Sequence, residues 1–300
     1  MAGQFTQIDL SQLAAPQVVE IIDFEVILAE MIADLQARDP TFTALVESDP
    51  TYKALEVAAF RETVLRQRCN DACTAVMLAY ATGTDLDQLG ANVDVPRLVI
   101  TAADLTAVPP VAAVMELDTP YRARIQLSFE GYTSAGSEGS YVFNSLSADA
   151  RIIDVQPISP SAGAVVVYVL CADGDGTAPQ DVIDAVTTAL SAQTVRPMTD
   201  FVTVQSAAIV DYEVTAVLQV RSGPDASTIV AAANAAAAVY AASVRKIGYD
   251  VALSGLYAAL QQAGVKRVDM SDPAANVVIG DGQAGYCTAI NITAVVATDG

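Results

Sequence analysis

Apolar residues recur at helical spacing near the start of the chain. Between Phe24 and Ala37 they fall three and four positions apart, a pattern that predicts an amphipathic helix. The pair Asp39-Pro40 ends this helix, because the residue before a proline is disfavoured in the helical conformation. This part of the chain is therefore predicted to be helical.

A second and longer helix is predicted from Tyr52 to Ala81, where neither glycine nor proline interrupts the sequence. Asp49 is expected as its N-cap, with Pro50 in the first turn, and Gly83 is expected at its C-cap. A run of about 30 residues at 1.5 Å per residue makes a rod of about 45 Å. A short helix should follow over Thr84–Gly90. The apolar positions of this predicted helix form an interrupted stripe along its length: Leu55, Ala59, Leu65, Cys69, Cys73, Val76 and Tyr80.

After Val99, short apolar runs separated by proline and glycine replace the helical spacing, and this favours strands and turns. Tyr121–Gly131 is expected to begin as a helical turn. The β-branched runs Ala150–Gln156 and Ala164–Leu170 are predicted to form two neighbouring antiparallel strands. The segment Gly131–Ser140 is small and polar, and its composition fits a flexible linker as well as a loop of defined shape.

Helices and strands alternate in the last part of the chain. Helices are predicted over 179–193, 226–244 and 251–263, and strands over 201–204, 210–220, 265–270, 277–279 and 288–296. The fold class is therefore α+β, with a helical N-terminal region followed by small mixed α/β modules with antiparallel strands. We expect a helical N-terminal arm (1–98), a β-rich middle domain (99–172), a small α+β module (173–222) and a C-terminal α+β module (223–300).

Charge and composition narrow the class of function. The chain carries 15 Lys and Arg against 35 Asp and Glu, for a net charge of −20. Such a surface repels phosphate, which disfavours binding to nucleic acid or to an anionic membrane. Without histidine the chain lacks His-based catalytic triads, imidazole metal ligands and the usual near-neutral pH switch. We therefore expect a structural protein that buries surface against partners, with no catalytic, cofactor or metal site.

Targeting signals and cysteines bear on where the protein is made. Residues 1–12 lack the basic and apolar regions of a secretory signal. The longest apolar run, Ile229–Val244, is mostly alanine and is expected to be too short and too weakly apolar to span a bilayer. The 4 cysteines are too few and too scattered for a disulfide framework. We expect synthesis in a cytoplasm and reduced thiols.

The long rod carries the candidate interaction residues. Its length exceeds that of a usual globular helix, so part of it is expected to serve another chain; the alternative is an internal hairpin with the preceding helix. Arg61, Arg66 and Arg68 form the densest basic cluster, and we expect them to pair with carboxylates across an interface or on a neighbouring helix. Cys69 and Cys73 lie one turn apart and are expected in a buried apolar stripe rather than in a metal site.

Two glycine-rich motifs invite a binding site, and each has a simpler interpretation. Asp173–Gly176 reads Asp-Gly-Asp-Gly, but an EF-hand loop started there would have Ala178 at its sixth position and Asp184 at its twelfth. A tight turn with glycines at positive φ is the better interpretation. Gly280–Gly285 has a loosely dinucleotide-binding outline, yet no helix opens after it, so a hairpin loop is expected.

Several segments, in order and spacing, cover nearly the whole chain and carry one resemblance. They are 60–72, 76–90, 97–100, 130–141, 146–150, 173–178, 195–207, 245–252 and 279–285. Together they resemble the baseplate assembly protein J family of contractile-tailed temperate phages. The first twenty residues and Thr101–Glu116 resemble it least.

The resemblance implies a wedge protein of the tail baseplate, located in the virion and assembled in the host bacterial cytoplasm. It implies a ring around a central hub and spike, built from two copies of this chain with a smaller I-type wedge protein, and a lysozyme-like W-type sheath initiator nearby. Candidate interface residues are Arg61, Leu65, Arg66, Arg68, Cys69, Val76 and Tyr80. Candidate hinge residues for relaying the contraction trigger are Gly83, Gly131, Gly136 and Gly139.

Other functions remain as alternatives. The equivalent component of an R-type bacteriocin or contractile injection system needs the same ring, and only neighbouring genes distinguish it from a phage component. A tail-associated hydrolase is disfavoured by the absence of histidine. A receptor-binding module is disfavoured because such modules tend to be β-rich and aromatic, whereas aromatic residues make up only 6% of this chain.

Overall fold

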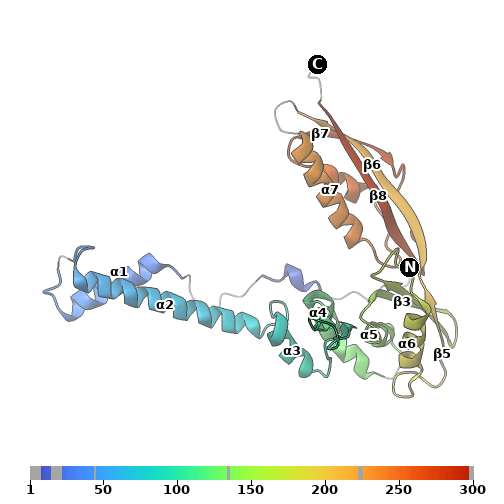
Figure 1. Cartoon of the computed structure of the whole chain (residues 1–300), viewed down its shortest axis with the longest axis horizontal. Helices are drawn as coiled ribbons and strands as arrows, with labels where there is room; N and C mark the ends of the chain where they lie inside the picture. The colour runs from blue at the N-terminus through green and yellow to red at the C-terminus, as the bar shows by residue number, and fades with distance from the viewer. Residues whose placement is uncertain (1–7, 15–21, 44, 134–135, 222–225, 297–300) are drawn as a thin grey trace. The chain divides into compact units, whose positions relative to one another are not determined.

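The computed structural model describes residues 8–14, 22–43, 45–133, 136–221 and 226–296. These residues divide into two compact units, Gln7–Arg97 and Leu98–Gly300, which are drawn in Figure 1. Both helices and small sheets are present, and the predicted α+β class is confirmed. Each unit is described by itself below.

The first unit is helical. It contains a 3-10 turn, Leu10–Gln12, and three helices: α1 (Phe24–Arg38), α2 (Pro50–Ala75) and α3 (Gly83–Ala91). The α1 helix begins where Asp23 accepts the backbone N–H groups of Glu25 and Val26. The predicted cap of α2 is confirmed, because the Asp49 carboxylate accepts the N–H of Thr51 at 2.7 Å with Pro50 in the first turn.

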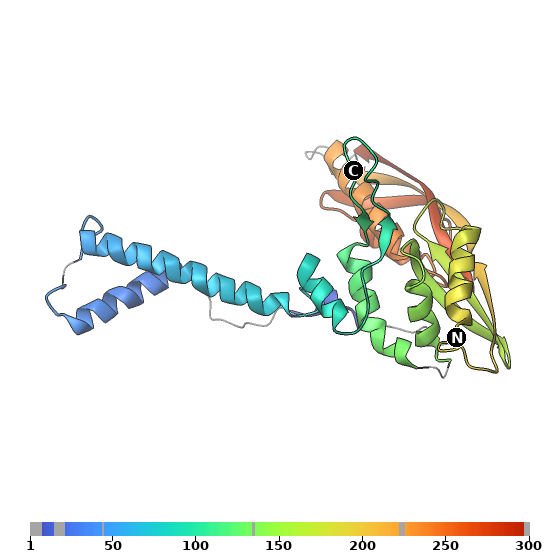
Figure 2. The same ribbon diagram turned by 60° about the horizontal axis from the view of Figure 1, so that its bottom comes forward.

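The α1 and α2 helices form a hairpin, with α1 lying along the first part of α2 (Figures 1 and 2). Ile27 and Leu28 of α1 and Ala59 of α2 are its buried centre. Half-buried apolar residues surround this centre: Phe24, Met31, Ile32, Tyr52 and Leu55. The hairpin is one of the two arrangements that the rod's length allowed.

The α2 helix was expected to continue to Ala81, but it ends at Ala75. The hydroxyl of Thr74 donates to the carbonyl groups of Asn70 and Asp71 in the last turn. Turns follow up to residue 80, and Gly83, expected at the C-cap of α2, instead opens α3 with φ +53°.

The second unit begins with a hairpin and three short helical segments. Strands β1 (Val99–Thr101) and β2 (Val114–Met115) pair antiparallel, and α4 (Asp118–Leu127), the 3-10 turn Ser128–Tyr132 and α5 (Glu138–Leu146) follow. The Ser137 hydroxyl caps α5 by accepting the N–H of Ser140. The helical turn predicted after Tyr121 is thus the middle of α4.

A three-stranded sheet forms the central module. Strands β3 (Ile152–Ser161) and β4 (Ala164–Cys171) are antiparallel neighbours as predicted, and β5 (Phe201–Ser206) pairs with β4 in parallel after a crossover through α6 (Gln180–Ser191). Its core joins Val167 and Val169 of β4 to Val182, Val186 and Leu190 of α6. The boundary expected after residue 172 lies inside this module, because a parallel pair needs the crossover helix.

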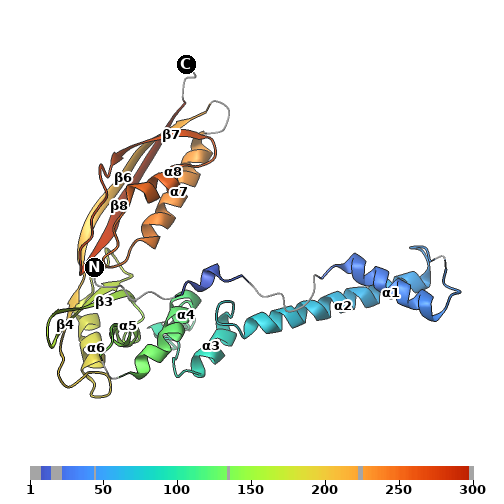
Figure 3. The same ribbon diagram turned by 180° about the vertical axis from the view of Figure 1, so that it is seen from behind.

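A second three-stranded sheet forms the C-terminal module, with order β7-β6-β8. It comprises β6 (Ala208–Val220), α7 (Ala226–Ser243), α8 (Leu253–Leu260), β7 (Val265–Asp272) and β8 (Gln283–Val296). Strand β7 is antiparallel to β6, whereas β8 is parallel to it. Helices α7 and α8 lie on one face of the sheet (Figure 3).

Helix α7 packs over the buried face of this sheet. Alternate β6 residues, Val214, Ala216, Leu218 and Val220, are fully buried beneath the helices. Among the described residues, α7 alone is long and apolar enough to cross a membrane, by length and composition. The expectation from the sequence rested on the shorter run Ile229–Val244, which was judged too short and too weakly apolar to span a bilayer. The α7 helix packs on the sheet through Ile229, Ala233 and Ala237.

Two expectations for this region are wrong. Val277 forms a single bridge with Val251 and is not part of a strand. Gly280–Gly285 is not a hairpin loop: β8 begins at Gln283 and lies beside β6, not beside β7. The expectation failed because a hairpin joins consecutive strands, whereas here the central strand β6 separates β7 from β8.

Candidate functional site

The α2 helix and its C-cap residue Val76 carry large apolar side chains that are exposed among the described residues. Leu65 is 62% exposed and Val76 is 69% exposed, and Val57, Phe60 and Val64 are exposed as well. Ala59 is the buried residue of this 26-residue helix. We call the exposed stretch from Val57 to Val76 the α2 apolar face.

Two residues of the α2 apolar face, Val57 and Val64, point away from α1. Val57 and Val64 are two turns apart and share one side of the helix, while Ala59, which contacts α1, lies about 200° around the helix from Val57. The α1 helix has 15 residues against 26 for α2. It therefore covers neither the opposite side of α2 nor its far end.

The three arginines of α2 fall into two groups. The Arg66 guanidinium donates to the Glu62 carboxylate one turn earlier, with 2.9 Å between Nε and Oε1. Arg61 and Arg68 are exposed, and within the described part of the chain neither makes an ion pair. In a chain with net charge −20, these two cations, which lie among the exposed apolar residues of α2, are available for carboxylates of another chain.

The remaining candidates on this rod are placed differently from one another. Cys69 is exposed and Cys73 is half-buried, so the expected buried stripe is wrong for Cys69. Half-buried Tyr80 donates its hydroxyl to the carbonyl of Leu13. Over the described ranges, no group of three His, Cys, Asp or Glu side chains is arranged to hold a metal ion.

The four candidate hinge glycines have different surroundings. Gly83 has φ +53°, and a Cβ built there would meet nothing within 4 Å. A Cβ on Gly131 would lie 2.4 Å from the Phe143 ring, and one on Gly139 would lie 2.6 Å from Glu130.

Gly136 has φ +73° and packs on Pro197 and Asp200. The Ser140 hydroxyl also donates to the carbonyl of Thr133. Of the two interpretations of residues 131–140, the described ones therefore support a loop of defined shape; residues 134 and 135 lie outside the described residues.

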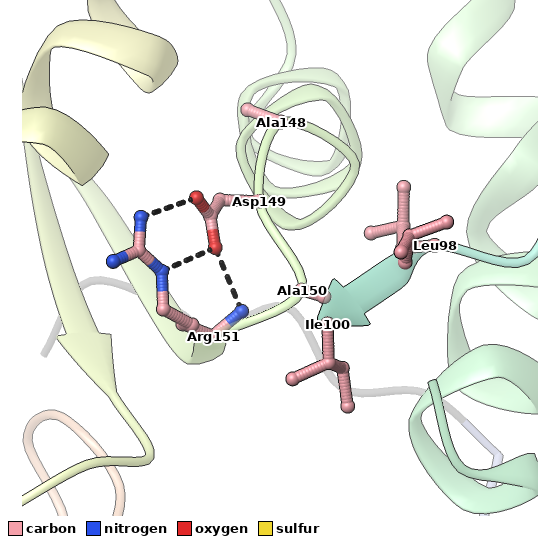
Figure 4. A pocket seen from close by; sticks show the side chains of 7 residues that line it. Leu98, Ile100, Ala148, Asp149, Ala150 and Arg151 are labelled. Atoms are coloured by element: carbon pink, nitrogen blue, oxygen red, sulfur yellow. Dashed lines mark hydrogen bonds and ion pairs between the residues drawn. The ribbon is translucent and has the colours of Figure 1, made fainter. Parts of the chain in front are cut away.

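A small pocket lies where β1 meets the loop before β3 (Figure 4). Its charged lining residues, Asp149 and Arg151, are joined at 2.8 Å, and Arg151 also binds Asp181 at 2.6 Å. The hydrogen bonds from Arg151 hold the pKa of Asp149 below its ordinary value. With its charges already paired, the pocket offers a structural ion pair rather than a catalytic group.

Sequence reasoning missed a second exposed apolar surface, the β1–β2 hairpin. Val108 is 98% exposed at its tip, and Val99, Ile100, Leu105 and Val111 are exposed along it. Asp104 is its one charged residue between 99 and 115. This absence of charge over a run of apolar residues was the signal available in the sequence.

Comparison with known proteins identifies the class. Three family models match in chain order: the baseplate J-like N-terminal domain over residues 47–104, the central domain over 133–206 and the C-terminal domain over 212–293. The first covers α2 and α3, the second the β3-β4-β5 module and the third the β7-β6-β8 module. The protein is a structural component of a baseplate.

A full-length relative identifies the family. Over 288 residues the chain is 46% identical to Baseplate protein J of Escherichia phage P2, spanning 94% of this chain and 95% of the relative. The chain belongs to the baseplate J-like protein family, and the resemblance seen in the sequence is confirmed.

Proposed function

We propose that this chain is a wedge protein of a contractile-tail baseplate and that the α2 apolar face is its contact with a smaller, I-type wedge protein and a second copy of itself. One observation carries the proposal: between Val57 and the C-cap residue Val76, large apolar side chains of α2 stay exposed on sides of the helix that α1 does not cover. Exposed large apolar side chains gathered on one helix are typical of a protein interface. Helices from other chains would complete a bundle around α2.

Charge on the same helix supports the proposal. Arg61 and Arg68 lie about 40° and 20° around the helix from Val57, among the exposed apolar residues, and are unpaired among the described residues. In an interface they would meet carboxylates of the other chain, which set register and association rate more than affinity. Arg66 is occupied by Glu62 and contributes less.

The other contacts of the wedge belong to the same proposal. We place the W-type sheath initiator and the central hub and spike among its partners, and we place its assembly in the host cytoplasm. The ring would exist in two interface arrangements, and receptor engagement by the tail fibres would favour the second, which releases the sheath to contract. Gly83, with positive φ and open space around it, supports a hinge there, whereas the tight surroundings of Gly131 and Gly139 disfavour bending at those residues.

Co-expression with the two flanking genes, followed by size-exclusion chromatography with light scattering, tests the wedge. A complex with two copies of this chain and one copy of the protein from a flanking gene supports the proposal. A folded monomer that binds neither of the two flanking proteins contradicts it. Leu65→Asp and Val76→Asp should each abolish the complex, because each places a charge in the apolar face. Val278→Asp is the matched control, since Val278 is equally exposed but lies in the C-terminal module.

Genes for capsid and DNA packaging beside this one would mark a phage, and a tail-only cluster would mark a bacteriocin or injection device. We propose no enzymatic activity, and clearing of peptidoglycan in a zymogram would contradict that.

A further inference from the structure

Three glycine-containing motifs of this chain meet at one place, between the central and C-terminal modules. They are Asp173–Ala178 after β4, Arg245–Ala252 after α7 and Ile279–Gly285 at the start of β8. We propose that they form a clamp that makes the two modules one rigid body, so that they move and open together. This goes beyond the proposed wedge function and does not depend on it.

The chain itself passes between the modules without a linker. Strand β5 ends at Ser206 and β6 begins at Ala208, so one residue separates the two sheets. That residue, Ala207, is buried and donates its N–H to the carbonyl of Val169 at 2.9 Å. Ala208 in turn donates to the carbonyl of Gly282 at 2.8 Å. The connection is therefore bonded on both sides.

The centre of the clamp is apolar. Ile247, from the loop after α7, is buried against Leu170 of β4, Ala207 of the connection and Ala284 of β8. Ile247 also forms a bridge with Ala284. One side chain of the C-terminal module thus fills a site built partly by the central sheet, and separating the modules would expose it to water.

Side chains of β3 hold the backbone of both C-terminal loops. Asp154 accepts the N–H of Ile247 at 2.7 Å. Two residues along the strand, on the same face, Gln156 accepts the N–H of Gly282 at 2.7 Å and donates to Asp281 at 3.2 Å. Each of these bonds crosses from one module to the other.

Arg245 of the C-terminal module binds the central module in turn. Its guanidinium donates to the carbonyl of Gly174 in the turn after β4 at 2.9 Å, and it lies 5.2 Å from the centre of the Tyr286 ring. It thus joins a turn of the central module to the first residues of β8.

Gly282 and Gly174 both have positive φ, but only Gly282 is also required by a close approach. Gly282 has φ +70°, and a Cβ there would lie 2.6 Å from the ring of Tyr168 in β4. Gly174 has φ +58°, but a Cβ there would meet nothing within 4 Å. The two positions share the backbone strain of a substitution, and only Gly282 adds a clash across the clamp.

Amide hydrogen exchange of the full-length chain, read by mass spectrometry, tests the clamp. In the unsubstituted chain, segments 245–252 and 280–286 should be as protected as β4, and all three should respond alike to low concentrations of urea. Gly282→Ala should speed exchange in both segments by about tenfold over Gly174→Ala, which is the matched control. Equal exchange in the two variants, or opening of the C-terminal loops at urea concentrations that leave β4 protected, would overturn the proposal.

A second pair of variants decides the matter if Gly282→Ala does not fold. Asp154→Asn keeps an oxygen that accepts the N–H of Ile247, whereas Asp154→Ala removes it. Exchange in segment 245–252 should stay near that of the unsubstituted chain in the first variant and rise in the second. An Asp154→Ala chain that exchanges as slowly as Asp154→Asn would show that the bond does not hold the modules together.

Discussion

Glu116 and Arg124 form an ion pair that is almost entirely removed from water, with the two side chains 4% and 3% exposed. The second carboxylate oxygen of Glu116 also accepts the N–H of Leu98 at 3.1 Å, and Arg124 reaches the hydroxyl of Ser147. The pair therefore joins the base of the β1–β2 hairpin to α4 and to the end of α5. Buried charges are tolerated only when they are paired and hydrogen-bonded in this way.

Glu116→Ala should lower the free energy of unfolding of the second unit by about 3–5 kcal/mol, because it leaves Arg124 charged and buried without its partner. Urea unfolding followed by circular dichroism measures the change. The double substitution Glu116→Leu with Arg124→Leu should recover most of the loss.

Glu62→Gln is the control for this prediction. It removes the half-buried pair with Arg66 and should cost less than about 1 kcal/mol. Similar costs for Glu116→Ala and Glu62→Gln would contradict a special role for the buried pair.

Thiol reactivity should report which cysteines lie on the surface. Cys69 is exposed, whereas Cys171 is buried, and burial raises the pKa of Cys171 to about 11. At pH 8 a thiol-reactive reagent should label Cys69 in seconds to minutes and leave Cys171 unlabelled until the chain unfolds, because the thiolate is the reactive form.

Cys69→Ser should remove the fast phase of labelling and leave the remainder unchanged. Assembly with the proposed wedge partner should slow labelling of Cys69, which lies on the same helix as the α2 apolar face. Rapid labelling of Cys171 in the native chain would contradict its burial in the central core.

Acid should weaken the attachment of the loop before β3. Hydrogen bonds from Arg151 hold the pKa of Asp149 below its ordinary value of 3.8. A carboxyl group with a lowered folded-state pKa contributes stability that is present above the unfolded-state pKa and lost as the pH falls through the folded-state pKa.

The difference in urea midpoint between the unsubstituted chain and Arg151→Ala should therefore be constant from about pH 5 to pH 8 and shrink below about pH 4. Asp149→Asn should show the same dependence, since it removes the other member of the pair. A difference that persists unchanged at about pH 2.5 would assign the effect of Arg151 to packing rather than charge.

Local elements were predictable where neighbouring residues determine them. The Asp49 cap of α2, the antiparallel pair β3–β4 and the glycine turn at Asp173–Gly176 follow from interactions within a few positions. The end of α2 was misplaced because neither glycine nor proline marks it in the sequence. The parallel pairing of β8 with β6 has no signature in the sequence of either strand.

The candidate surface was only half predictable. Helical periodicity shows that α2 has an apolar stripe. The sequence pattern of such a stripe is the same whether it packs against a helix of its own chain or against another chain. The structure shows that Ala59 faces α1 while Leu65 and Val76 stay exposed. It also shows Cys69 outside the core and an apolar hairpin at Val108.

The sequence by itself determined the helices, most strands, the acidic histidine-free character and the family resemblance, because periodicity, caps and composition are properties of short stretches of chain. The tertiary structure alone decided the parallel pairings β4–β5 and β6–β8, which side of α2 is left uncovered and the meeting of three distant motifs around Ile247. These depend on which surfaces come together across many residues, and non-local contact of that kind leaves no periodic signal in either partner.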